Sequence, residues 1–160
     1  MATHGTDRRR PPRSSMKTFR TSLEIQATPG QVFAAISAPE RLARWWGPSG
    51  FTNTFSVCEF RNGGRWSLVM HAPNGASYPS ENIFDEIDPL ARVVVVHASE
   101  PRFRLTIGLA PSARGTLVTW SQEFADEKVA EALEPIVVPA NDQNLARLAA
   151  ETRRGLVAGE

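Results

Sequence analysis

Hydrophobic residues recur at every second position through most of the chain between residues 18 and 124, the period of a half-buried β-strand. Seven segments follow this pattern: 18–26, 51–61, 65–71, 78–87, 91–98, 102–109 and 116–124. Short turn sequences such as Asn62-Gly63-Gly64, which favours a tight hairpin, separate the last six. Strands joined by such short connections must pair antiparallel.

Two short helices are expected between the first and the second strand. Thr28 is a good N-cap residue, and Pro29 stands at a first helical position, where its missing N–H costs nothing. Residues 37–39 (Ser-Ala-Pro) repeat this device and open the second helix. Residues 47–50 (Gly-Pro-Ser-Gly) end that helix.

The pattern becomes helical again after the last strand. Residues 126–133 predict a short helix, and Pro135 and Pro139 are expected to interrupt it. Asn141 or Asp142 is then expected to cap a separate final helix.

The order of the elements predicts how they pack. The strands alternate with apolar residues on one face only, so another element must cover that face. The final helix, with Leu145 and Leu148 on one side, is the long element left to do so. We therefore predict an α+β domain over residues 18–157 with a helix-grip fold, in which a seven-stranded curved antiparallel sheet wraps around a C-terminal helix.

The net charge of +1 over 160 residues gives no sign of nucleic-acid binding, but the charge is unevenly distributed. Residues 1–17 hold five basic residues against one acidic residue, a net charge of +4. The remaining chain holds 13 basic and 16 acidic residues, a net charge of −3. A basic start with proline and serine is typical of a disordered tail, with a transit-like segment or a phosphate-binding arm as alternatives.

Cys58 is the single cysteine, which excludes an internal disulfide and any metal site with several thiolate ligands. No histidine at local spacing activates it, so a buried and inert thiol is expected. No apolar run approaches the roughly 20 residues that span a bilayer, and the N-terminal sequence lacks the apolar segment of a secretory signal. We therefore expect a cytoplasmic protein without a membrane partner.

Four motifs occur in a recognisable order and spacing: 39–48 (PERLARWWGP), 63–66 (GGRW), 73–78 (PNGASY) and 84–87 (FDEI). Together they resemble the AHSA branch of the START-related helix-grip superfamily (SRPBCC), a branch named for homology to activators of the heat-shock-protein ATPase. The resemblance covers residues 18–124 and implies a seven-stranded sheet that grips a C-terminal helix. The pattern of elements predicts the same fold independently.

The final helix departs from the family pattern. Relatives usually carry a Gly-Trp pair at the entrance to this helix, followed by two leucines three residues apart. Leu145 and Leu148 keep that spacing, but residues 139–142 (Pro-Ala-Asn-Asp) stand where the Gly-Trp pair is expected. Because this helix lines the cavity in the family, the resemblance does not carry a ligand type over to this chain.

The predicted cavity lies between the sheet and the final helix. The candidate lining residues are Trp45, Trp46, Trp66, Met70, Tyr78, Phe84, Glu86, His97, Trp120, Gln122, Leu145 and Leu148. Trp45 and Trp46 point about 100° apart on a helix, so at least one of them is expected to pack in the core. Gln122, on the same face as Trp120, either orients a ligand or occupies an exposed strand position.

Glu86 is the most interesting candidate for acid–base chemistry, because a carboxyl group buried on an apolar strand keeps its proton to higher pH than usual. The alternative is an ordinary salt bridge with Arg65 or Arg104. His71 and His97 lie on different strands without a metal-binding spacing, so no metal is expected. No cofactor is expected either.

Three functions compete at this point. The first is a carrier or sensor of a small, largely hydrophobic molecule, and the second is a cyclase-, hydrolase- or lyase-like enzyme that uses the same cavity. The third is a chaperone-regulator-like protein-interaction module. Clustered polar residues in the cavity favour the enzyme, an apolar cavity favours the carrier, and a large exposed apolar patch favours a protein partner or a homodimer. The mixed outer face of the sheet leaves a modest homodimer interface open.

Overall fold

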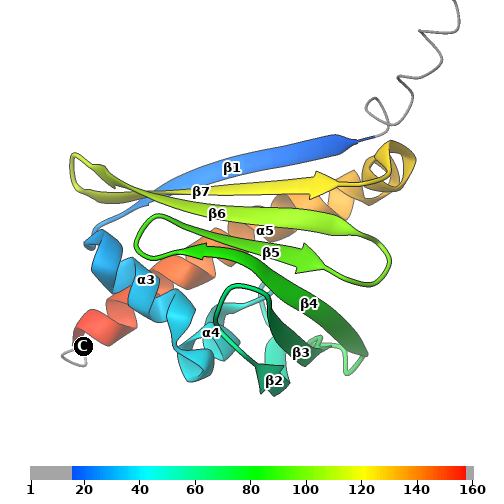
Figure 1. Cartoon of the computed structure of the whole chain (residues 1–160), viewed down its shortest axis with the longest axis horizontal. Coiled ribbons are helices and arrows are strands. Elements are labelled where there is room, and N and C mark those ends of the chain that lie inside the picture. The colour runs from blue at the N-terminus through cyan, green and yellow to red at the C-terminus, as the bar shows by residue number, and fades with distance from the viewer. Residues whose placement is uncertain (1–15, 158–160) are drawn as a thin grey trace, which may run out of the picture.

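The computed structural model describes residues 16–157, so most of the expected basic tail, residues 1–15, lies outside the described part of the chain. The strands are β1 (Lys17–Ile25), β2 (Thr52–Cys58), β3 (Gly64–His71), β4 (Ser77–Asp88), β5 (Arg92–His97), β6 (Phe103–Ser112) and β7 (Gly115–Phe124). The helices are α3 (Pro29–Ser37), α4 (Pro39–Trp45) and α5 (Glu127–Val157) (Figure 1).

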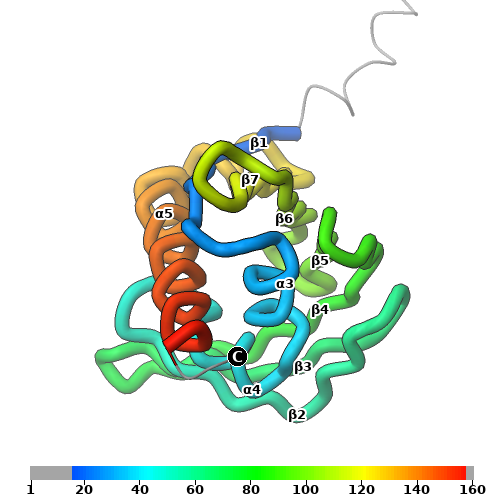
Figure 2. The backbone as a smooth tube through the Cα atoms, turned by 90° about the vertical axis from the view of Figure 1, so that its left-hand side faces the viewer, coloured from blue at the N-terminus to red at the C-terminus, as the bar shows by residue number. Residues whose placement is uncertain are grey.

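The seven strands form one sheet in the order β1-β7-β6-β5-β4-β3-β2, and every neighbouring pair is antiparallel. Figure 2 shows the sheet curling from β1 to β2, with α5 closing the open side of the curve. Short connections join β2 to β7 in a meander, and β1 pairs with β7. The predicted helix-grip fold is therefore confirmed.

The two short helices begin at the predicted prolines. At α3, the Gln31 backbone N–H donates to Thr28 Oγ1 over 3.1 Å and the Thr28 N–H donates to Gln31 Oε1 over 2.9 Å, a complete capping box. At α4, the N-cap residue is Ala38, which forms no side-chain cap. The prediction that the Ser-Ala-Pro sequence repeats the capping device is therefore right for Pro39 and wrong for the capping side chain.

The turn before β3 differs from the predicted tight hairpin. β2 ends at Cys58 and β3 begins at Gly64, so the connection is longer than two residues. Gly63 has a φ of +79°, and a Cβ on Gly64 would lie 1.9 Å from the Glu59 carbonyl oxygen. The two glycines are needed because the chain folds back tightly on residue 59.

Helix α5 corrects the prediction of two helices separated by prolines, because it continues without interruption through Pro135 and Pro139. Each proline removes one helical hydrogen bond. Both are exposed, so water can reach the carbonyl groups left without a helical partner. Asn141 and Asp142 consequently lie inside the helix, where Asp142 Oδ1 accepts a hydrogen bond of 2.6 Å from Thr21 Oγ1.

The main core lies between the concave face of the sheet and the three helices. Its largest fully buried side chains include Trp45, Trp66, Phe84, Leu145 and Leu148. A smaller cluster at the start of α5 packs Ala130 against Phe19 and Phe124. None of the helices in the described part of the chain is long and apolar enough to cross a membrane.

Candidate functional site

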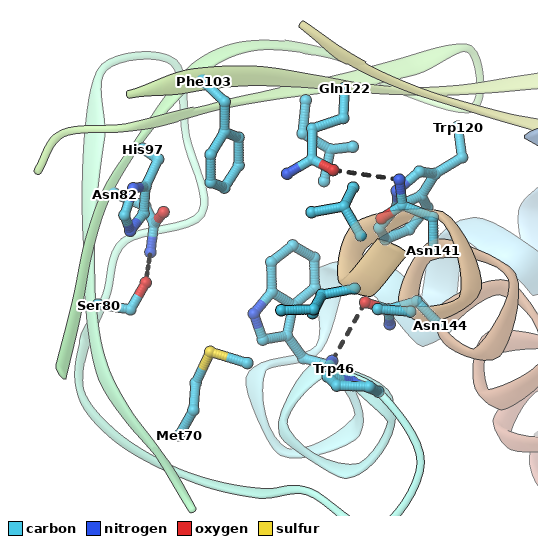
Figure 3. Close-up of a pocket in the computed structure, with 16 residues that line it drawn as sticks. Trp46, Met70, Ser80, Asn82, His97, Phe103, Trp120, Gln122, Asn141 and Asn144 are labelled. Carbon is cyan, nitrogen blue, oxygen red and sulfur yellow. Dashed lines mark hydrogen bonds between the residues drawn. The ribbon is translucent and has the colours of Figure 1, made fainter. Parts of the chain in front are cut away.

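A cavity of about 210 Å³ lies between the concave face of the sheet, the first half of α5 and the segment that follows α4 (Figure 3). It is lined by Trp46, Gly47, Pro48, Met70, Ser80, Asn82, His97, Phe103, Leu105, Trp120, Gln122, Ile136, Val137, Ala140, Asn141 and Asn144. Ile136 is 67% exposed although it lines the cavity, so the mouth lies beside this residue of α5.

The cavity wall carries no Asp, Glu, Lys or Arg side chain. Its amide groups are largely paired: Asn141 Nδ2 donates to Gln122 Oε1 over 3.1 Å, and Asn144 Nδ2 donates to the Trp45 carbonyl over 3.2 Å. His97 is the only histidine of the wall. The site is therefore uncharged and mainly apolar, with a few fixed polar groups.

Five of the twelve predicted residues line this cavity: Trp46, Met70, His97, Trp120 and Gln122. Gln122 is only 9% exposed, so it belongs to the buried face of β7 and not to an exposed strand position. Its predicted partner Trp120 lies two residues earlier on the same face, as strand alternation requires.

Five other predicted residues support the cavity from behind without lining it. These are Trp45, Trp66, Phe84, Leu145 and Leu148. The Trp45 indole N–H donates to the Ala35 carbonyl over 2.9 Å, which holds Trp45 in the core while Trp46 turns to the cavity. Trp66 stacks parallel on Phe84 and contacts Trp46 edge-to-face, with ring centroids 5.1 Å and 4.7 Å apart.

Tyr78 and Glu86 lie away from the cavity. Tyr78 is 50% exposed. Strand alternation from Phe84 predicts an inward Glu86, but the pairing of β4 with β5 shifts between these two residues in a β-bulge. The bulge turns Glu86 outward, where it accepts a hydrogen bond of 2.6 Å from Arg92. Glu86 therefore forms a salt bridge, but its partner is Arg92 and not Arg65 or Arg104, and Arg104 contacts Asp85 instead.

Arg147 fixes the segment at the cavity mouth, and sequence reasoning missed it. From α5, its Nη1 lies 3.1, 2.8 and 2.8 Å from the carbonyl oxygens of Trp46, Gly47 and Pro48. Its Nη2 donates to the carbonyls of Arg44 and Phe51 over 2.8 and 2.9 Å. Desolvation by burial lowers the pKa of Arg147.

Asn144 adds to this connection from the preceding turn of α5. Its Oδ1 accepts a hydrogen bond of 3.3 Å from the Gly47 N–H, as Figure 3 shows. Its side chain is therefore held at both ends, since its Nδ2 is bound to Trp45. No local sequence signal marks Asn144 or Arg147, because their partners are backbone carbonyls and amides about 100 residues earlier in the chain.

A second polar cluster on the same helix lies outside the cavity. Glu151 is buried and accepts hydrogen bonds from Arg41, Arg44 and Arg154 at distances from 2.8 to 3.2 Å. Burial raises the pKa of Glu151, but the hydrogen bonds from these arginines outweigh it and lower the pKa to about 2. This cluster joins α4 to α5.

No metal centre is built by the described residues. Within residues 16–157, no group of three or more histidine, cysteine and acidic side chains is arranged to hold an ion. Cys58 is half-buried, and desolvation raises the pKa of its thiol to about 11.

A curved antiparallel sheet that grips a long C-terminal helix defines the helix-grip class of proteins. The chain matches the family described as Activator of Hsp90 ATPase homolog 1-like protein over residues 26–152, and it belongs to that family. No curated protein of known function is similar enough in sequence to match.

Several solved structures share the fold. A protein from Chromobacterium violaceum is 26% identical, with a TM-score of 0.72 over 84% of this chain and 96% of its own. A protein from Arthrobacter aurescens is 22% identical, with a TM-score of 0.78 over 86% of each chain. An AHSA1-like protein from Aeromonas hydrophila is 19% identical, with a TM-score of 0.69 over 90% of this chain and 97% of its own.

Proposed function

We propose that this protein binds a small, largely apolar molecule in the cavity between the sheet and α5, and that it acts as a carrier or sensor of that molecule. The observation that carries this proposal is the composition of the wall. A cavity of about 210 Å³ that is lined by Trp46, Met70, Phe103 and Trp120 and holds no charged side chain favours an uncharged apolar occupant.

The rigidity of the site supports binding. A preformed site loses little conformational entropy when a ligand enters. Arg147 and Asn144 hold the mouth segment through backbone hydrogen bonds, and Trp46 packs against Trp66 and Trp120. These contacts position the ring of Trp46 before any ligand arrives.

The alternatives draw less support. The acid–base candidate Glu86 is ion-paired outside the cavity, and no carboxylate lines the wall. The strands carry two exposed large apolar side chains, Tyr78 on β4 and Leu117 on β7. Two other strands lie between β4 and β7 in the sheet. Tyr78 shares the face of Ser80 and Asn82, whereas Leu117 is on the opposite face, so these two residues form no continuous patch for a protein partner.

The test is a titration with ethylbenzene, a neutral apolar probe, followed by proton–nitrogen correlation NMR of the tryptophan indoles. We expect the indole signal of Trp46 to shift saturably. Ala140 lines the cavity, so Ala140→Phe should fill the space and abolish the shift. Ala146 is exposed on the same helix, and Ala146→Phe is the matched control that should retain it. An unchanged response in Ala140→Phe, or no response of the wild type, would contradict the proposal.

A further inference from the structure

Two hydrogen-bond acceptors lie together on one wall of the cavity. Asn82 on β4 and His97 on β5 are direct partners in the strand register, and both line the cavity. Figure 3 shows their side chains next to each other, across the cavity from Trp46.

The contacts of Asn82 determine the orientation of its amide. Asn82 Nδ2 lies 3.1 Å from Ser80 Oγ and 3.4 Å from the Trp66 carbonyl oxygen. Because a backbone carbonyl only accepts hydrogen bonds, the atom that faces it must be the amide nitrogen. Asn82 Oδ1 is therefore the atom left over, and within residues 16–157 it has no hydrogen-bond partner.

The same reasoning determines the tautomer of His97. Its Nδ1 lies 2.8 Å from the Pro101 carbonyl oxygen, so Nδ1 carries the proton. In the neutral imidazole, Nε2 is then an acceptor. The ring stacks on Phe103 with centroids 4.7 Å apart, which fixes its plane. The wall thus presents two acceptors side by side, Asn82 Oδ1 and His97 Nε2.

The opposite side of the cavity presents a donor. The indole nitrogen of Trp46 points into the open space in Figure 3, and it has no hydrogen-bond partner in the described part of the chain. A ligand without a hydrogen-bond donor would remove water from both acceptors and leave them unpaired. The free-energy cost of such an unpaired acceptor is larger than the net gain from one hydrogen bond. A hydroxyl group donates one proton, which pairs one of the two acceptors, and its oxygen can still accept a hydrogen bond.

We propose that the ligand of this cavity is an uncharged, hydroxyl-bearing molecule about one ring in size, whose hydroxyl group donates a hydrogen bond to Asn82 Oδ1 or His97 Nε2. This inference rests on the proposed function. The size follows from the volume, because a cavity of about 150 Å³ accommodates benzene and this one measures about 210 Å³. The absence of charge follows from the wall, which offers no ionic partner.

The experiment compares four probes that share one ring and one ethyl group: ethylbenzene, para-ethylphenol, para-ethylanisole and para-ethylbenzoate. Dissociation constants come from the indole N–H shift of Trp46. We expect para-ethylphenol to bind about 3- to 10-fold more tightly than para-ethylanisole, whose methyl group replaces the donated proton. The charged benzoate should bind more weakly than all three neutral probes.

Two variants connect the difference to the named acceptors. His97→Phe keeps the ring stacked on Phe103 and removes Nε2, and Asn82→Leu keeps the side-chain volume and removes Oδ1. Each should reduce the advantage of para-ethylphenol over para-ethylanisole. The matched control is His71→Phe, since His71 hydrogen-bonds with Thr54 and Ser77 and does not line the cavity.

The outcomes separate the two proposals. If ethylbenzene binds but para-ethylphenol and para-ethylanisole have equal affinity in the wild type, the hydroxyl inference is overturned and the apolar binding site stands. Tight binding of para-ethylbenzoate would also overturn it. If no probe binds, the proposed function fails and the inference fails with it. An advantage that His97→Phe or Asn82→Leu removes and His71→Phe preserves supports the inference.

Discussion

Replacing Arg147 by methionine tests whether the backbone contacts of this residue hold the cavity mouth in place. The substitution keeps most of the aliphatic stem and removes the guanidinium, so five hydrogen bonds to backbone carbonyls are lost. The substitution also removes the donor that is shared by three partly buried carbonyl groups, those of Trp46, Gly47 and Pro48.

The magnitude follows from the sharing of donors. Three of the five carbonyls share one nitrogen, so together the contacts stabilise the fold about as much as two to three ordinary hydrogen bonds, at roughly 1 kcal/mol each. Their loss also leaves carbonyl acceptors without a partner, which adds to the cost. Removing the desolvated charge of Arg147 returns part of this. We expect Arg147→Met to lower the free energy of unfolding by about 2–4 kcal/mol.

Urea denaturation followed by tryptophan fluorescence measures this change. The matched control is Arg153→Met, because Arg153 is an exposed arginine on the same helix. The control should change stability by less than about 0.5 kcal/mol. Arg147→Lys should fall between the two, since an ammonium group has three donors and lacks the planar fork. An Arg147→Met variant as stable as Arg153→Met would refute the reasoning.

Three further predictions concern acid stability, thiol reactivity and the two central tryptophans. Glu151 has a pKa of about 2 in the folded chain against 4.5 ordinarily, so its stabilising effect is complete above about pH 5 and is lost as pH falls toward 2. Denaturation at a series of pH values should show that the wild type loses roughly 3 kcal/mol of stability over this range, whereas Glu151→Gln should not. If the stability of both proteins changes in parallel with pH, the lowered pKa of Glu151 is contradicted. The Cys58 thiol has a pKa of about 11, so at pH 8 it should react with iodoacetamide at least tenfold more slowly in the folded chain than in the urea-unfolded chain. Mass spectrometry measures both rates, and equal rates would exclude the raised pKa. Trp66→Ala should destabilise the fold by about 3–5 kcal/mol, whereas Trp46→Ala should mainly weaken the binding of ethylbenzene. Equal affinity of the two folded variants for ethylbenzene would contradict this difference in roles.

The strand pattern predicted most of the fold because alternation records burial directly. The seven strands, the two short helices at Pro29 and Pro39, and the inward face with Trp120 and Gln122 all follow from residue type and spacing. The prediction fails at Glu86, because a β-bulge depends on how two strands pair and leaves no mark in the alternation of one strand.

Sequence patterns also do not predict the continuity of α5 or the polar contacts at the cavity mouth, for a different reason. Pro135 and Pro139 look like helix breakers until their exposure is known. Arg147 and Asn144 bind backbone groups that lie far away in the chain, and any residue type supplies such groups. Asn82 became a candidate only when the register placed it beside His97.

The most direct test of the account is native mass spectrometry of the full chain purified from its own host, followed by denaturing release of whatever is bound. The account predicts one small neutral molecule per chain, lost in Ala140→Phe and retained in Ala146→Phe. A chain that carries no molecule from its host and binds neither ethylbenzene nor para-ethylphenol afterwards would contradict the claim that the cavity between the sheet and α5 is a ligand-binding site.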